Sequence, residues 1–231
     1  MSPSTAPSKP RAWDAAGRGG LALVLGGFVA YALVSHWLMV HAANRPWAVA
    51  VLFGPLVLAV AGTGWQRRQP AVLLACAAGV ALIALVVARG GVDDVNRMYV
   101  LQHGGIHLAL AWAFGSTLRG GATPLITTIA EGLHRRLNQR FTPEMRAYTR
   151  WVTGAWTVFF LAMVVVSALI YVLAPWPWWS FFCNVLTPLA AVLMTLAEHA
   201  HRYRRHPDFE RISIRAAFGA WRQAGSAGQA P

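Results

Sequence analysis

The side chains of this sequence whose type and position point to chemistry are ionisable groups within long apolar segments. His36 lies in one such segment, His103 and His107 lie in another, and Glu198 closes a third. An ionisable group inside a bilayer costs free energy, so each of these residues is a functional candidate by default. The middle of each apolar segment lacks Lys, Arg and Asp, which argues against an ion-coupled pump with a charged relay.

Several polar candidates share one face of a predicted helix. Tyr99, His103 and His107 follow one another at four-residue intervals, which places them on the same helical face. His36 is expected at a depth similar to that of His103, and Asn184 near the same side. We therefore expect a polar cavity in the outer half of a helix bundle. Its members are His36, Tyr99, Gln102, His103, His107 and Asn184, with Asp93 and Asp94 as its cover.

Three interpretations of this cluster are open. The first is a hydrogen-bonded packing network between helices, which polar side chains commonly form in membrane bundles. The second is a metal or haem site, for which the HxxxH pair and His36 would supply imidazoles. The third is a substrate or lipid pocket in which a His acts as acid or base. The HxxxH spacing alone is weak, so we expect packing before a ligand site, and neither a metal nor a cofactor.

Other chemical signatures are missing from the sequence. Cys76 and Cys183 both lie in apolar segments, so a disulfide framework or a CxxC metal site is not supported. The chain has no GxSxG, Walker A, HExxH or dinucleotide-binding motif. An enzymatic activity is therefore less expected than a non-catalytic role.

The sequence predicts that the helices of an all-α, multi-pass membrane protein position these residues. Of 231 residues, 56% are apolar and 12% are charged, which is too much hydrocarbon for one soluble core. A segment of about 20 apolar residues crosses a bilayer as a helix. We predict six such helices, at 20–40, 46–65, 71–88, 98–118, 151–174 and 178–197. They form a membrane domain over 19–200, between a disordered cytoplasmic N-terminus (1–18) and a basic cytoplasmic tail (201–231).

The positions of the basic residues predict the orientation. With six spans and a cytoplasmic N-terminus, 17 of the 20 Lys and Arg residues lie on the cytoplasmic side, and the exceptions are Arg45, Arg89 and Arg97. Basic loops stay in the cytoplasm, so both termini are expected inside. The net charge of +12 then indicates anionic headgroups as neighbours rather than nucleic acid. Lys9 is the sole lysine, a composition that suggests a GC-rich bacterial genome and hence the bacterial inner membrane.

The basic residues concentrate in the segment 119–150 and in the tail. Leu125, Ile129, Leu133 and Leu137 recur every four residues, which predicts an amphipathic helix lying on the cytoplasmic membrane face. Thr142 and Pro143 predict the cap and first position of a second helix. The expected surface for lipid or a partner comprises Arg119, Arg135, Arg136, Arg140, Arg146, Arg150, Arg202, Arg204 and Arg205.

A resemblance rests on the second half of the chain. The residues that carry it are the run YVLQHGGIHLALAWAFGSTLRGGATPLIT, an LH pair, the stretch YTRWVTGAW and a following FF. In these residues the chain resembles a family of small bacterial inner-membrane proteins encoded among genes for aryl-polyene or xanthomonadin-type pigment synthesis. The first three predicted spans match that family only in hydropathy. Some members carry a ketosynthase label, which this chain contradicts, because both cysteines are predicted inside membrane spans.

The resemblance implies an envelope role close to acyl-chain or polyene lipid assembly, and it provides no active site to transfer. The first hypothesis is a non-catalytic scaffold that meets anionic lipid, an acyl carrier protein or biosynthetic enzymes at its basic face. The second is a transporter or flippase-like carrier of a lipidic intermediate, working through the polar cavity. The third is a His-dependent metal or haem enzyme of the membrane.

Overall fold

The chain is helical throughout its described regular structure. A computed structural model describes residues 12–43, 45–90, 92–206 and 209, and these residues form helices and connecting turns with no strand. The predicted all-α class is therefore confirmed for the described part of the chain. Residues 1–11 and 210–231, which belong to the predicted disordered N-terminus and basic tail, lie outside it.

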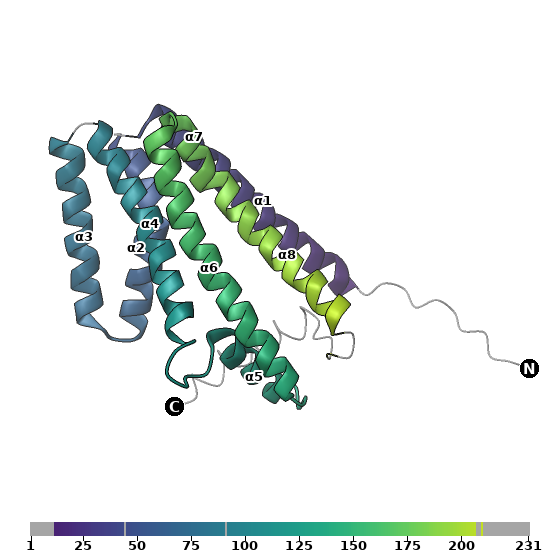
Figure 1. Cartoon of the computed structure of the whole chain (residues 1–231). Helices are drawn as coiled ribbons and strands as arrows, with labels where there is room; N and C mark the ends of the chain where they lie inside the picture. The colour runs from purple at the N-terminus through teal and green to yellow at the C-terminus, as the bar shows by residue number, and fades with distance from the viewer. Residues whose placement is uncertain (1–11, 44, 91, 207–208, 210–231) are drawn as a thin grey trace, which may run out of the picture. The chain divides into compact units, whose positions relative to one another are not determined.

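The helices follow the predicted segments closely (Figure 1). They are α1 (Ala12–His41), α2 (Pro46–Gln66), α3 (Pro70–Arg89), α4 (Val92–Ser116), α5 (Leu125–Arg136), α6 (Pro143–Leu173), α7 (Trp176–Phe181), the π-helix η1 (Phe182–Leu186) and α8 (Thr187–Arg205). They belong to two compact units, residues 1–95 and 96–231, with the boundary inside α4.

Helix α1 begins earlier than expected. It starts at Ala12, whereas disorder was predicted as far as residue 18. Ala15 and Ala16 are strong helix formers, so this segment continues the apolar helix toward the N-terminus. The Pro and Ser residues that indicated disorder are confined to residues 1–11.

Four helical stretches in the described residues are long and apolar enough to cross a membrane. They are α2, α3, α6 and the continuous run Trp176–Arg205 that comprises α7, η1 and α8. No residue of α3 is buried, and large apolar side chains such as Leu74 and Val172 are more than 70% exposed. Water would disfavour so much exposed apolar surface, whereas a lipid environment accommodates it.

The two other predicted spans, 20–40 and 98–118, do not combine the length and the hydropathy of a membrane-spanning helix. The described apolar stretch of α1 is limited to Leu25–His41. Helix α4 is long enough, but it is the least apolar of the six because Asp93, Asp94 and Arg97 stand near its start and two histidines follow. Six spans and their orientation therefore stay a prediction.

The first unit contains a tight hairpin of α2 and α3 (Figure 1). Pro46 and Pro70 each occupy the first turn of their helix, where the missing N–H costs no hydrogen bond. Arg68 turns the chain with a φ of 51°. A Cβ at Gly64 would lie 2.9 Å from Val72 Cγ1, so the close approach of the two helices requires glycine there.

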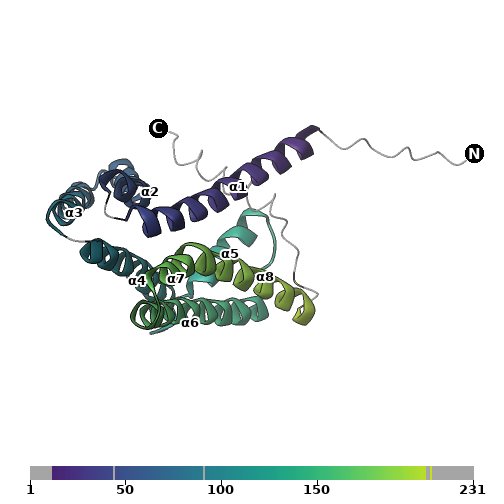
Figure 2. The same cartoon turned by 90° about the horizontal axis from the view of Figure 1, so that it is seen from above.

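In the second unit, α6 is the helix against which the others pack (Figure 2). Phe114 of α4 contacts Phe160 of α6 with ring centroids 5.3 Å apart. One residue further along α4, a Cβ at Gly115 would lie 3.0 Å from Thr157 Cγ2 of α6. At the other end of α6, the buried indole of Trp179 in α7 donates a 3.0 Å hydrogen bond to Ser167 Oγ.

The start of α6 confirms the predicted cap. Thr142 Oγ1 accepts a 3.3 Å hydrogen bond from the Met145 N–H, and Pro143 follows the cap. From there the helix is continuous over 31 residues as far as Leu173. The second helix of the basic segment and the fifth predicted span are thus one element.

An irregularity precedes Pro188. Residues 182–186 form the π-helix η1, and the Thr187 N–H donates to Phe182 O, five residues back. Pro188 has no N–H and cannot continue an α-helical ladder, and single π turns absorb such interruptions. Pro55 lies within α2, which continues on both sides of it.

Candidate functional site

The predicted polar cluster is divided between elements of both units. Tyr99, Gln102, His103 and His107 lie on α4, and Asn184 lies on η1, all within the second unit. His36 lies on α1 in the first unit, and Asp93 and Asp94 stand in the first turn of α4. The geometry below concerns the residues of the second unit.

His103 and His107 form a pair of tilted rings on α4, with an angle of 36° between the ring planes. Their ring centroids are 4.2 Å apart, as expected for neighbours one turn apart. His107 Nδ1 lies 2.8 Å from the carbonyl oxygen of His103, so Nδ1 carries the proton and donates it. His103 Nε2 lies 3.4 Å from Thr187 Oγ1 on α8, while His103 Nδ1 is buried without a hydrogen-bond partner.

Aromatic rings enclose this pair. Trp179 and Phe182 each meet the His103 ring edge-on at 6.0 Å, and Phe160 lies 6.1 Å from the His107 ring. The pair therefore joins α4 to α6, to the α7–η1 segment and to the start of α8. This geometry favours the packing interpretation of the cluster.

The remaining members of the cluster contribute in different ways. Tyr99 is almost fully buried, with its ring 6.5 Å from that of Trp176. Asn184 Nδ2 donates to the carbonyl oxygen of Ser180 at 2.9 Å, one turn back along its own helix. Within the described residues, no group of three or more His, Cys, Asp or Glu side chains is arranged to hold a metal ion.

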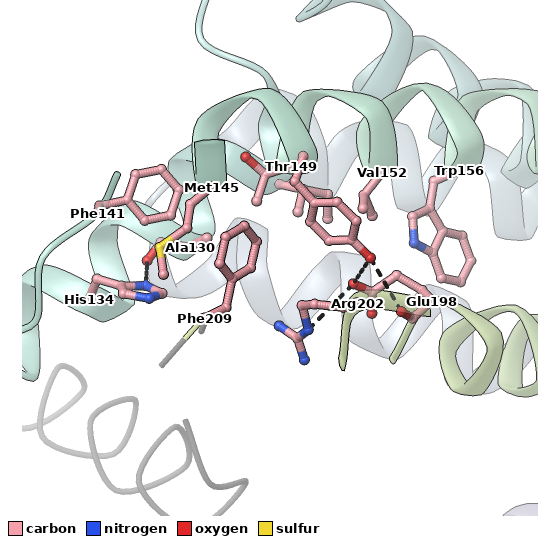
Figure 3. Close-up of a pocket in the computed structure, with 12 residues that line it drawn as sticks. Ala130, His134, Phe141, Met145, Thr149, Val152, Trp156, Glu198, Arg202 and Phe209 are labelled. Atoms are coloured by element: carbon pink, nitrogen blue, oxygen red, sulfur yellow. Dashed lines mark hydrogen bonds and ion pairs between the residues drawn. The ribbon is translucent and has the colours of Figure 1, made fainter. Parts of the chain in front are cut away.

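A second site, which the sequence did not reveal, lies at the opposite end of the same unit. It is a cavity of about 200 Å³ between α5, α6 and the end of α8 (Figure 3). We call it the α5–α6–α8 pocket. Its lining residues are Ile126, Ala130, His134, Phe141, Met145, Tyr148, Thr149, Val152, Trp156, Glu198, Arg202 and Phe209.

One end of the pocket is a polar group that links α6 to α8. The Tyr148 hydroxyl donates to Glu198 Oε1 at 3.1 Å and also lies 3.3 Å from the Glu198 carbonyl oxygen. Arg202 Nε lies 3.8 Å from the same carboxylate oxygen. Glu198 is thus the carboxylate partner of a basic residue one turn further along α8.

The other end of the pocket is formed by His134 of α5 (Figure 3). His134 Nδ1 lies 2.8 Å from the Ala130 carbonyl oxygen and therefore donates to it. The ring meets Phe141 edge-on at 5.1 Å. His134 is only 8% exposed, and its Nε2 is buried with no hydrogen-bond partner.

Hydroxyl groups hold α5 against α6 and thereby set the width of the pocket. Thr127 Oγ1 and Thr149 Oγ1 are 2.7 Å apart and buried. The Ile126 N–H donates to Thr153 Oγ1 at 3.3 Å. An ion pair between Arg146 and Glu131 closes the same interface at its exposed edge.

The sequence pattern does not predict which α5 residues are buried against α6. Thr127 and His134 are buried, whereas Ile129, a member of the predicted apolar stripe, is 58% exposed. The helix also ends before Leu137, because Asn138 takes a left-handed conformation with a φ of 53°. Ile129 is thus directed away from α6, and the α5 residues that are buried include the polar Thr127 and His134.

The predicted basic residues of the second unit are mostly exposed. Arg202 is half-buried at the pocket, and the exposed ones are Arg119, Arg135, Arg136, Arg140, Arg146, Arg150, Arg204 and Arg205. Arg150 Nη2 donates to Leu118 O at 2.9 Å, which brings the end of α4 beside the start of α6. Together with the contact between Tyr148 and Glu198, this bond gathers the basic residues of α5, α6 and α8 at one end of the unit (Figure 1).

Comparisons of the chain with models of known protein families, with curated proteins and with solved structures find no match. The arrangement of residues described above is therefore the basis for any statement about function.

Proposed function

We propose that the chain is a six-span protein of the bacterial inner membrane with both termini in the cytoplasm. Four apolar helices of spanning length support the membrane location. The uneven distribution of the basic residues, with only Arg45, Arg89 and Arg97 on the opposite side, supports the orientation. In this arrangement α5 lies on the cytoplasmic face, with the exposed side chain of Ile129 available to lipid.

Its function in this proposal is that of a non-catalytic accessory protein that recruits an acidic partner. The observation that carries the proposal is the collection of exposed arginines at one end of the second unit, around α5 and the end of α8. Complementary charge speeds association and selects partners. Acyl carrier proteins are acidic, so they suit this surface.

The resemblance in residues 99–160 supplies the biochemical setting. The related proteins are encoded beside enzymes of aryl-polyene and acyl-chain synthesis, so the proposed partner is an acyl carrier protein or an enzyme of that assembly. The protein would hold these soluble components at the membrane, where a lipidic product is needed.

Charge reversal tests this proposal. The full chain is placed in phosphatidylcholine vesicles, and co-sedimentation of a purified acyl carrier protein is measured at low salt. Arg135→Glu, Arg136→Glu and Arg140→Glu combined should weaken binding at least tenfold, since these side chains are exposed on the basic end. The matched control reverses Arg45, Arg89 and Arg97, and should bind as the wild type does. Equal binding by both triple variants would contradict the proposal.

A second candidate is a carrier of a lipidic intermediate, and the observation behind it is the π-helix beside the pair of His103 and His107. π turns occur often at functional sites, and the pair contacts three other helical segments. His103→Ala or His107→Ala should stop export of the intermediate and cause it to accumulate inside the cell. Wild-type export by both variants would rule this candidate out.

A further inference from the structure

Two buried polar atoms of the α5–α6–α8 pocket have no hydrogen-bond partner among the residues that the structure describes. One is the donor Arg202 Nε, whose nearest acidic atom, Glu198 Oε1, is 3.8 Å away. The other is His134 Nε2, which must be an acceptor because Nδ1 of the same ring carries the proton. Leaving such groups unsatisfied in a buried site is costly. A ligand that satisfies both must offer an acceptor to Arg202 and a donor to His134.

The two atoms stand at separate ends of the pocket, with Phe209 between them (Figure 3). A suitable ligand is therefore extended, with its anionic group at one end and its donor at the other. The Glu198 carboxylate is the ion-pair partner of Arg202, but at 3.8 Å it lies beyond hydrogen-bond distance of Nε, so this N–H remains to donate to an anionic oxygen. Arginine binds phosphate oxygens through its fixed N–H donors.

The surroundings of the pocket are those of a lipid headgroup site. Its lining includes several apolar and aromatic side chains, among them Met145, Val152 and Trp156. Toward its C-terminus α6 continues as an apolar helix of spanning length, whereas exposed arginines such as Arg146 and Arg150 stand at its start. A molecule bound here can place a polar head in the pocket and hydrocarbon chains along α6.

We propose that the α5–α6–α8 pocket binds the headgroup of a glycerol-type anionic phospholipid, phosphatidylglycerol. Its phosphate accepts from Arg202 Nε, and a headgroup hydroxyl donates to His134 Nε2. Choline has no N–H or O–H to donate, so phosphatidylcholine leaves His134 unsatisfied. Ethanolamine can donate but gives a headgroup without net charge, which the arginines around the pocket attract less. This site goes beyond the proposed function, because it needs no protein partner.

Lipid binding by the purified full chain tests the proposal directly. Detergent-solubilised protein is titrated with phosphatidylglycerol, phosphatidylethanolamine or phosphatidylcholine of identical acyl chains, and the first bound lipid is counted by native mass spectrometry. Phosphatidylglycerol should bind at least tenfold more tightly than phosphatidylcholine. Equal affinity for these two lipids would show that the protein has no site selective for phosphatidylglycerol. Equal affinity for phosphatidylglycerol and phosphatidylethanolamine would overturn the assignment of the glycerol headgroup.

Two variants locate the binding in this pocket. Arg202→Lys keeps the charge but removes the Nε–H, and His134→Phe keeps a ring of similar size but removes the acceptor. Each should lose most of the tenfold preference for phosphatidylglycerol. Arg204→Lys makes the same change at an exposed position of α8 that does not line the pocket, and should keep the preference. If Arg202→Lys and Arg204→Lys bind the lipid equally well, the pocket is not the site, even if His134→Phe fails to fold. No acyl carrier protein is present, so this result is independent of partner recruitment.

Discussion

The Tyr148 hydroxyl donates a 3.1 Å hydrogen bond to the carboxylate of Glu198, which lies fifty residues further along the chain. This bond joins the first turns of α6 to the last turns of α8. It also fixes one wall of the α5–α6–α8 pocket, because both residues line that pocket. The relationship therefore connects the stability of the second unit to the geometry of its proposed lipid site.

Tyr148→Phe should destabilise the protein. The phenol is 8% exposed, and loss of a hydrogen bond to a charged group costs about 1–2 kcal/mol. Unfolding of the purified protein in mixed micelles measures the change. Tyr171→Phe is the control, because Tyr171 lies on the same helix and its hydroxyl forms no hydrogen bond with any of the described residues. An equal loss of stability in both variants would argue against the contact with Glu198.

Two adjacent tryptophans should respond very differently to substitution. Trp179 is fully buried and donates to Ser167 Oγ, whereas Trp178 is 64% exposed. Trp179→Phe should lower the free energy of unfolding by about 1–3 kcal/mol, since it leaves a buried hydroxyl without its donor and removes ring volume. Trp178→Phe should change it by less than about 0.5 kcal/mol. Comparable effects at the two positions would contradict the packing of α7 on α6.

The contact between α4 and α6 predicts a difference between two glycines. A side chain at Gly115 meets Thr157 at 3.0 Å, whereas nothing lies within 4 Å of a Cβ at Gly104. Gly115→Val should therefore lose about 1–3 kcal/mol more stability than Gly104→Val. Because the helix propensity of the new residue is the same at both positions, the difference reports the interhelical contact. Thermal unfolding in detergent provides the comparison, and equal midpoints would mean that α4 does not approach α6 at Gly115.

Much of the fold can be predicted because a helix that crosses a bilayer needs about 20 consecutive apolar residues. Segments of about 20 apolar residues separated by Pro, Gly and Arg define α2 and α3 almost to the residue. The cap at Thr142 can be predicted equally well, because Thr followed by Pro is a local signal for the start of a helix. The full length of α6 is harder to predict, since the polar residues before Trp151 are compatible both with a short separate helix and with the first turns of the fifth span.

The candidate site was harder to predict, for physical reasons. The stripe from Leu125 to Leu137 has the same periodicity whether it faces protein or lipid, so it could not reveal that α5 buries Thr127 and His134 against the protein. The contact between Tyr148 and Glu198 depends on a chain reversal fifty residues long, which local spacing does not encode. Of these contacts, only the one between His103 and His107 could be predicted from the sequence, because four-residue spacing brings the two rings together within one helix.

The orientation of the second unit in the membrane is the claim on which both proposals depend. Single cysteines are introduced by Ala122→Cys, in the turn between α4 and α5, and by Trp178→Cys in α7, after Cys76→Ala and Cys183→Ala. Both positions are exposed. Spheroplasts are then treated with a membrane-impermeant maleimide. A cytoplasmic basic end predicts labelling at position 178 in intact spheroplasts and at position 122 only after lysis. Labelling at position 122 in intact spheroplasts would place the basic end outside the cell and contradict the proposed orientation.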